Sequence, residues 1–348
     1  HEAARDAEHW QVLTFRARSF RWASAFLSRA QRRRVAALYA FCRAVDDLAD
    51  ADWATPEAQR DLALLQAALA VEPDGEELWP PSYLWFRELC LDCGIDFQVV
   101  RELLIGMSSD LGIVRLQSDR ELIRYCYRAA GTVGLMMCAV LGVRDPRAWR
   151  HAIDLGIAMQ LTNISRDVLE DAETCRVYLP ADRLAQYGVT PEDLVDGRAD
   201  PGAVRIVVDD VLTLAEDYYE SGDAGMRFLP IRARWAILVA SRLYRGIGRR
   251  LRRRQASDPL RGRVVVPWFE KLGLVVAGTA SWIRVSLRPS WTVVEAQYRD
   301  QHLQSLPYAD ADAGAGADSD AGTDTAAASG TVPGAVVSQS RHALGHPH

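Results

Sequence analysis

The sequence of 348 residues predicts a single all-α domain, and three observations support this. Apolar residues recur at the three- and four-residue spacing of helices almost throughout the chain. Alternating segments bounded by turns are nearly absent, and the only short β-like run covers residues 264–266. No shift of composition divides residues 19 to about 300. We therefore expect roughly eight to ten helices with short connections around one core.

Capping residues and helix breakers mark the boundaries of these helices. Ser118 and Glu121 have the spacing of a capping box, and three other capping residues each precede a proline. These three are Thr55, Asp145 and Thr190. Glycine or proline interrupts the helical pattern at residues 73–75, Gly94, Gly142 and Pro180. We expect helices to end at these four places.

The two ends of the sequence differ from the predicted helical domain, which we place at residues 19–305. Residues 1–18 form an N-terminal segment, and residues 306–348 are rich in Ala, Gly and Asp. So polar a tail cannot bury enough surface to offset its ordering entropy, which predicts disorder. The five Asp and one Arg after residue 309 supply −4 of the formal charge of −5. The nearly neutral remainder argues against a nucleic-acid partner.

Composition also bears on where the protein works. No secretory segment opens the sequence and no run of about 18 apolar residues occurs, which predicts a cytoplasmic protein with reduced thiols. Cys90 and Cys93 form a lone C-x-x-C pair that we interpret as helical core, not as a zinc site. Six arginines cluster within residues 245–254. They indicate either a solvated helix end or peripheral contact with the anionic inner face of a membrane.

Two predicted helices carry paired aspartates. In residues 31–50 an apolar stripe runs through Val35, Leu38, Cys42, Val45 and Ala49. A second stripe at steps of three and four carries Tyr39, Arg43, Asp46 and Asp50, with Asp47 beside it. Like charges one turn apart weaken an isolated helix by a few tenths of a kcal/mol. Their retention on an otherwise apolar helix requires a compensating interaction.

The second such helix, from about residue 146 to residue 171, repeats the arrangement. One strip of its surface carries Gly156, Gln160, Asn163, Asp167 and Asp171, with Arg166 beside the first aspartate. A single D-x-x-x-D pair usually lies on a solvated helix face, but two such helices favour a shared role. Magnesium takes oxygen ligands and bridges carboxylates to phosphates. P-loop, HExxH and GxGxxG signatures are absent, so a magnesium-bound diphosphate beside an apolar cavity is the expected ligand.

Gly131 and Gly134 interrupt the predicted helix at residues 125–141. Each glycine costs about 1 kcal/mol relative to alanine in a helix interior. Close packing against another helix would explain both residues. Room for an isoprenoid chain is the functional alternative, and on this interpretation both belong to the substrate site.

At these residues the sequence resembles the squalene/phytoene synthase family over most of residues 19 to about 288. The strings that carry the resemblance are YAFCRAVDDLAD at 39–50, YCYRAAGTVGLMM at 125–137, QLTNISRDVLEDAETCRVYLP at 160–180 and LYRGIG at 243–248. The second and third are more similar to phytoene synthases than to squalene synthases. Residues 172–175 depart from the Ala-Arg-Asn-Gly expected before Arg-Val-Tyr-Leu-Pro.

The resemblance implies an isoprenoid synthase-type helical bundle around a central cavity, and roles for individual residues. Magnesium, with manganese as the alternative ion, would be bound by Asp46, Asp47, Asp50, Asp167 and Asp171. Catalytic positions would be Tyr39, Arg43, Arg166 and Tyr244. The remaining positions implied to bind substrate or line the cavity and its flap are Ser19, Gln160, Asn163, Arg176 and Tyr178.

The implied reaction joins two geranylgeranyl diphosphates head to head, through a cyclopropyl diphosphate, to phytoene in carotenoid biosynthesis. A final proton loss would make NADPH unnecessary. One alternative is condensation of two C15 chains to squalene, hydroxysqualene or dehydrosqualene. A class I terpene cyclase fits the spacing of the second aspartate pair poorly, and a non-catalytic assembly or lipid-binding relative would be expected to lose its metal ligands.

Overall fold

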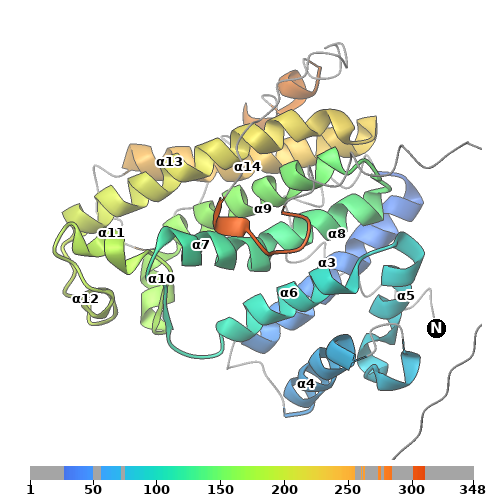
Figure 1. Ribbon diagram of the computed structural model, residues 1–348. Helices are drawn as coiled ribbons and strands as arrows, with labels where there is room; N and C mark the ends of the chain where they lie inside the picture. Colours follow the sequence, from blue (N-terminus) through green and yellow to red (C-terminus); the bar gives the residue numbers. More distant parts are fainter. Residues whose placement is uncertain are drawn as a thin grey trace, which may run out of the picture. The chain divides into compact units, whose positions relative to one another are not determined.

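The computed structural model describes residues 27–49, 56–71, 75–254, 260, 262, 273–275, 278–283 and 301–309 (Figure 1). Across these residues the protein is all-α apart from one short ladder, as the sequence predicts. The predicted β-like run at 264–266, the predicted tail beyond residue 309, and the predicted site residues Ser19 and Asp50 lie outside the described residues. Residues 306–309, which the sequence assigned to the disordered tail, are instead packed against the helices.

Helices of ten residues or more form most of the fold. They are α3 (Arg29–Ala49), α4 (Pro56–Val71), α5 (Leu84–Cys93), α6 (Phe97–Ser109), α8 (Thr132–Leu141), α9 (Arg147–Arg166), α13 (Pro201–Gly225) and α14 (Ile231–Arg254). Shorter helical elements are η1 (Glu76–Leu78), η2 (Pro81–Tyr83), α7 (Asp119–Cys126), η3 (Tyr127–Gly131), α10 (Val168–Glu173), α11 (Ala181–Ala185), α12 (Pro191–Val195), η4 (Met226–Phe228) and η5 (Gln301–Leu303).

Several helix boundaries follow from the predicted caps. Thr190 and Asp193 form a reciprocal capping box at the start of α12, and the Ser118 hydroxyl accepts a hydrogen bond from the Glu121 backbone N–H. Gly94 and Gly142 end α5 and α8 in the left-handed conformation, with φ of 68° and 79°. Glycine adopts this conformation without a Cβ penalty.

The predicted helix stop at Pro180 is wrong. The helix ahead of it, α10, already ends at Glu173, and Pro180 instead precedes the first residue of α11. Proline is favoured at a helix start because the first N–H groups have no partner within the helix.

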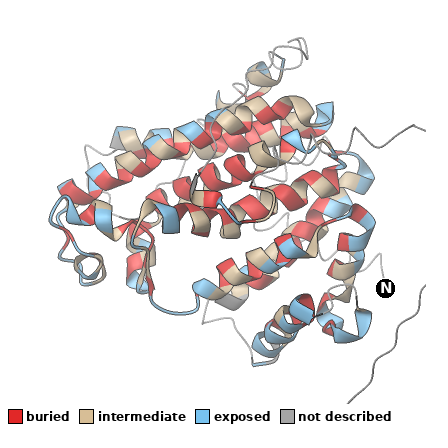
Figure 2. Cartoon of the chain, in the orientation of Figure 1, coloured by how far each residue is buried: buried red, intermediate tan, exposed pale blue. Residues whose placement is uncertain are grey.

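The centre of the core is α9, which contacts α8, η3, α13 and α14. Figure 2 shows buried residues along nearly its whole length. Ile153, Ile157 and Leu161 are each 0% exposed. A helix that is apolar on several sides is expected at such a position. Because the strip from Gly156 to Asp167 runs along α9, it passes through the core.

Two predicted continuous helices are interrupted in the structure. The helix expected to reach residue 171 breaks at Asp167, which has φ −105° and ψ 17°, and resumes as α10. The helix expected over 125–141 contains the π-helical segment η3, between α7 and α8. Such segments insert one residue into a helix and are frequent at functional sites.

Close backbone contact accounts for the glycines of this region. A Cβ at Gly134 would lie 2.2 Å from the Ala152 carbonyl oxygen, and one at Gly156 would lie 2.3 Å from the Ala130 carbonyl oxygen. A Cβ at Gly131 would meet Ile153 Cγ2 at 3.3 Å. The packing explanation of Gly131 and Gly134 therefore has a direct physical basis, and their substrate role stays a prediction.

A two-residue parallel ladder joins β1 (Val114–Arg115) to β2 (Arg176–Val177), with Val114 opposite Arg176. Periodicity did not predict it, because two residues are too few for an alternating pattern. The ladder fixes the chain after α10 beside the chain after α6. Cys175, just before β2, has φ 60°, a left-handed conformation that is uncommon for a residue with a Cβ.

Residues 301–309 pack across the helices as a strap, a name kept below for this segment. Leu303, Leu306 and Ala309 are buried. The Tyr127 hydroxyl donates to the Pro307 carbonyl oxygen at 2.8 Å, and Arg124 donates to the Gln304 carbonyl oxygen at 3.1 Å. Contacts between residues so distant in the chain make this segment part of the helical body.

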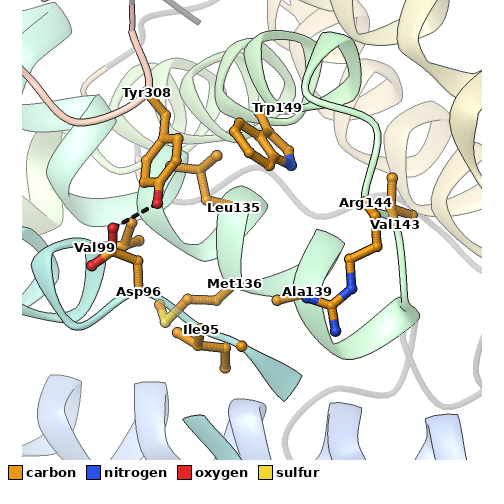
Figure 3. A pocket seen from close by; sticks show the side chains of 11 residues that line it. Ile95, Asp96, Val99, Leu135, Met136, Ala139, Val143, Arg144, Trp149 and Tyr308 are labelled. Carbon is orange, nitrogen blue, oxygen red and sulfur yellow. Dashed lines mark hydrogen bonds between the residues drawn. The ribbon is translucent and has the colours of Figure 1, made fainter. Parts of the chain in front are cut away.

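The strap also borders a cavity of about 70 Å³ between α5, α6, α8 and the start of α9. Figure 3 shows Tyr308 above it, donating to an Asp96 carboxylate oxygen at 2.6 Å, with Trp149 beside it. None of the predicted site residues lines this cavity. The larger cavity for hydrocarbon chains stays a prediction.

Two further expectations concern thiols and membranes. Cys90 and Cys93 are both 1% exposed and belong to the hydrophobic core, in line with their interpretation as core residues. All six cysteines are free thiols. Within the described ranges, no helix has the length and apolar character required to cross a bilayer.

Candidate active site

The first aspartate group lies at the C-terminal end of α3. Arg43 Nη1 and Asp46 Oδ2 are 2.7 Å apart, and the same guanidinium forms an ion pair with Asp47. The Asp46 side chain is 52% exposed and the Asp47 side chain 33%. Tyr39 lies one turn before Arg43 and is half-buried. Arg43 thus neutralises two of the three aspartates, while Asp50 lies beyond the described part of α3.

The second group lies where α9 meets α10. Arg166 Nε donates to Asp167 Oδ1 at 2.6 Å, and the two side chains are paired through a second contact. The Asp167 side chain is 18% exposed. The pKa of the Asp171 carboxyl is raised from 3.8 to about 7, chiefly by burial and also by the charges of Asp167 and Asp110, while Arg176 opposes the rise.

An amide pair lies on the same strip of α9. Asn163 Nδ2 donates to Gln160 Oε1 at 3.3 Å. The other Asn163 side-chain atom, Oδ1, is buried and accepts no hydrogen bond from the described residues. The Asn163 carbonyl accepts from the Asp167 N–H at 2.9 Å, so the spacing of the strip is kept across the helix break. A buried acceptor without a donor is costly. A bound ligand that donates a hydrogen bond to this oxygen, or a cation that it coordinates, would remove that cost.

Asp110 connects the two groups, and sequence reasoning missed it. It follows α6, is 7% exposed, and accepts hydrogen bonds from the hydroxyls of Tyr125 and Tyr178. The pKa of its carboxyl is raised to about 6, chiefly by burial and also by the charge of Asp46, while the two tyrosine hydrogen bonds oppose the rise. Since Asp110 interacts electrostatically with Asp46 on α3 and with Asp171 on α10, the two acidic groups lie within electrostatic reach of one residue.

The remaining predicted residues divide between this region and elsewhere. Arg176 lowers the pKa of Asp110 and of Asp171, which places its charge near both carboxyls. Tyr244, on α14, interacts electrostatically with Arg166. Gly131 and Gly134 instead lie at the seam between η3, α8 and α9.

The oxygen atoms at these two groups fit a hard divalent cation. Carboxylates and an amide oxygen are the ligands magnesium prefers, and burial raises the pKa of Asp171, so a bound cation would stabilise its ionised form. Among the residues with described positions, no cluster of three or more His, Cys, Asp or Glu side chains is arranged to hold a metal ion. The residues available are Asp46, Asp47, Asn163, Asp167 and Asp171.

Comparison with known proteins gives one family. The model of the squalene/phytoene synthase family matches residues 14–270. A phytoene synthase from Pseudescherichia vulneris is 39% identical over 246 residues, covering 68% of this chain and 79% of the relative. A 15-cis-phytoene synthase from Enterobacter agglomerans is 38% identical over 270 residues, covering 75% of this chain and 90% of the relative.

Solved structures give the same picture for the fold. A ligand-bound dehydrosqualene synthase superposes with a TM-score of 0.70 at 26% identity, covering 81% of this chain and 98% of the other. A squalene synthase from Alicyclobacillus acidocaldarius superposes with a TM-score of 0.61 at 20% identity, covering 74% of this chain and 96% of the other.

Proposed function

The chain belongs to the squalene/phytoene synthase family, and on that premise we propose that it condenses two geranylgeranyl diphosphates head to head to phytoene. It is a prenyltransferase of carotenoid biosynthesis. The choice of product follows the curated relatives at 38–39% identity, which are named phytoene synthases. The observation that supports chemistry at this site is the electrostatic interaction of Asp110 with aspartates of both α3 and α10.

In the proposed reaction one diphosphate leaves, and the freed C1 bonds to the double bond of the second molecule. Loss of a proton then gives a cyclopropyl diphosphate. The second diphosphate leaves, the ring rearranges to join C1 to C1′, and a further proton loss gives phytoene. No electrons are gained or lost, so the proposal needs no NADPH.

The residues divide this work by charge. Asp46, Asp47, Asp50, Asp167 and Asp171 would hold magnesium, or manganese in its place, which when bound neutralises the departing diphosphate. Arg43 and Arg166 now pair with aspartates, and each guanidinium could instead bind diphosphate oxygens once the cation holds those carboxylates. Gln160, Asn163, Arg176, Tyr39 and Tyr244 would orient the substrate around them.

Product analysis tests the proposal. The purified protein is incubated with magnesium and either geranylgeranyl or farnesyl diphosphate, with and without NADPH, and products are identified by mass spectrometry. We expect phytoene from the C20 substrate, independent of NADPH. A C30 product alone would overturn the assignment and favour the C15 condensation, for which the superposition on a dehydrosqualene synthase argues.

Peripheral membrane contact through the arginines of α14 is a further part of the proposal. Arg245 is paired with Glu216 and Asp223, and Arg252 with Asp209, all on α13. These pairs reduce the positive charge that α14 could offer to anionic lipid. Co-sedimentation with anionic liposomes at low and high salt tests the contact, and absence of binding at both would remove it from the proposal.

A further inference from the structure

A buried cluster of two tyrosines and one aspartate lies within electrostatic reach of both acidic groups. The Tyr178 hydroxyl donates to Asp110 Oδ1 at 2.8 Å, and the Tyr125 hydroxyl donates to Asp110 Oδ2 at 3.0 Å. The two rings stack with centroids 4.7 Å apart. Tyr125 and Tyr178 are 8% and 6% exposed. Each carboxylate oxygen therefore accepts one phenol, and both phenolic protons are committed to Asp110.

Three separate elements supply this cluster. Asp110 caps the C-terminal end of α6, Tyr125 lies on α7, and Tyr178 directly follows β2. The β1–β2 ladder holds Tyr178 in register with the chain that follows Asp110. Any displacement of the cluster would therefore shift the segment at Arg176, whose charge acts on both Asp110 and Asp171.

Folding alone gives a poor reason for a carboxylate here. A negative charge at a helix C-terminus opposes the helix dipole, and burial adds a desolvation cost that two phenols only partly offset. Replacing both partners of a buried hydrogen bond by apolar groups of the same shape can leave stability nearly unchanged. A costly buried carboxylate that is hydrogen-bonded on both oxygens and interacts with aspartates of both acidic groups points to function.

We propose that Asp110 is a positioning residue of the condensation, which holds the hydroxyls of Tyr125 and Tyr178 and, through Tyr178, the segment at Arg176. The inference deepens the proposed function and rests on it. A phenol that donates its proton to a carboxylate retains only acceptor capacity. Each of the two phenol groups thus forms a fixed dipole, and its hydrogen bond to Asp110 sets the direction of the negative end, the phenol oxygen. Fixed dipoles of that sign stabilise positive charge as it develops, without reorganisation during the reaction.

Single substitutions separate this role from a general structural one. Tyr125→Phe and Tyr178→Phe each remove one hydroxyl and keep the ring. Asp110→Asn keeps the shape but leaves one oxygen where there were two. We expect kcat to fall roughly tenfold in each Phe variant and roughly 100-fold in Asp110→Asn, with KM within about twofold, since positioning acts on the reacting geometry.

Tyr127→Phe is the matched control. Tyr127 is also buried and lies two residues from Tyr125, but its hydroxyl donates to the Pro307 carbonyl of the strap. It loses the same kind of hydrogen bond outside the cluster. We expect its melting temperature to fall as much as in the other Phe variants while kcat stays within about twofold of wild type.

A double variant, Asp110→Asn with Tyr178→Phe, tests whether Asp110 acts through the tyrosine. We expect a loss in kcat clearly smaller than the product of the single losses, because both substitutions break one linkage. Full multiplication of the losses, or a loss in Asp110→Asn with none in either Phe variant, would overturn the inference. A kcat for Asp110→Asn within twofold of wild type, or an equal loss in Tyr127→Phe, would do the same. If wild-type protein forms no phytoene, the proposed function fails instead.

Discussion

Two aspartate pairs with identical spacing, Asp46 with Asp50 and Asp167 with Asp171, meet different surroundings in the fold. Of the first pair, Asp46 lies within α3, where its side chain is 52% exposed and paired with Arg43, and Asp50 lies outside the described residues. The second straddles a helix break, and burial raises the pKa of Asp171 to about 7. Sequence spacing sets which residues share a face, whereas burial sets the free energy of charging them.

The difference predicts unequal responses to a cation. Binding at α3 must separate Asp46 and Asp47 from Arg43, so one favourable interaction replaces another. Binding at α10 relieves a carboxyl that is costly to ionise. The second pair should therefore gain more from the metal than the first.

The largest expected effect is a loss of activity when either aspartate pair is altered. Asp46→Asn and Asp167→Asn should each lower turnover by at least about 10²–10³-fold, since each removes a metal-binding charge from the site of diphosphate departure. Phytoene formation from geranylgeranyl diphosphate measures this. Asp209→Asn, on the α13 surface paired with Arg252, serves as the control. Unchanged activity in both Asp variants would contradict the assigned roles and favour a non-catalytic protein.

A second substitution, Gly156→Ala in α9, tests whether the region of Asp167 and Asp171 depends on close helix packing that α3 does not require. Gly156→Ala would place its Cβ 2.3 Å from the Ala130 carbonyl oxygen. Backbone must move to relieve that contact, so we expect the free energy of unfolding to fall by about 3 kcal/mol. Urea denaturation measures it. Ala37→Gly in α3 is the contrast and should cost only about 1 kcal/mol; equal losses would remove this difference between the pairs.

The pH dependence of stability sharpens the contrast further. Asp171 in the folded protein binds its proton up to about pH 7, whereas in the unfolded chain it loses it near 3.8. Stability without metal should therefore rise as pH falls through 7, and the penalty should be complete above it. We expect Asp171→Asn to gain about 2 kcal/mol at pH 8 in EDTA and less at pH 6.

Two comparisons check this result. Asp46→Asn, at the exposed position, should change the free energy of unfolding by less than about 0.5 kcal/mol at pH 8. Magnesium with inorganic diphosphate should stabilise wild type and not Asp171→Asn. A gain for Asp171→Asn that is the same at pH 6 and pH 8 would refute the link to ionisation.

The smallest expected effect concerns Cys175, in the chain segment that follows Asp171 and α10. Cys175 holds φ 60°, a conformation that costs a residue with a Cβ about 1–2 kcal/mol. Glycine avoids that cost but loses about 0.5–1 kcal/mol through the unfolded chain. Cys175→Gly should therefore raise the free energy of unfolding by about 0.5 kcal/mol. Cys175→Ala keeps the Cβ and should change little, so an equal gain there would implicate the thiol instead.

Spacing predicted the buried stripe of α3 and the four-residue step from Asp167 to Asp171 because helical periodicity survives local irregularity. Val35, Leu38 and Val45 form the buried stripe of α3 as expected. The break at Asp167 was missed because the Asp171 N–H still donates to the Asp167 carbonyl across it, and the four-residue step is preserved. The departure at residues 172–175 was visible in sequence, but only the structure shows that Cys175 occupies a left-handed position.

Asp110 could not be predicted from its own neighbourhood. A single aspartate after an apolar helix has the appearance of a solvated helix end, and its partners lie 15 and 68 residues away. Its burial depends on the pairing of β1 with β2, and two-residue strands leave no periodic signal. In the sequence, the one feature that indicated a buried Asp110 is that this single acid follows the core positions Leu103 and Met107.

The strap has a consequence for how the protein is made. Arg124 and Tyr127 each bond to a residue 180 positions later. At ribosomal speeds of about 5–20 residues per second, roughly 10–40 s separate synthesis of the two partners. During that interval the outer side of α7 and η3 lacks its final cover. Nascent chains therefore pass through a stage in which the apolar sites that Leu303 and Leu306 later cover are exposed.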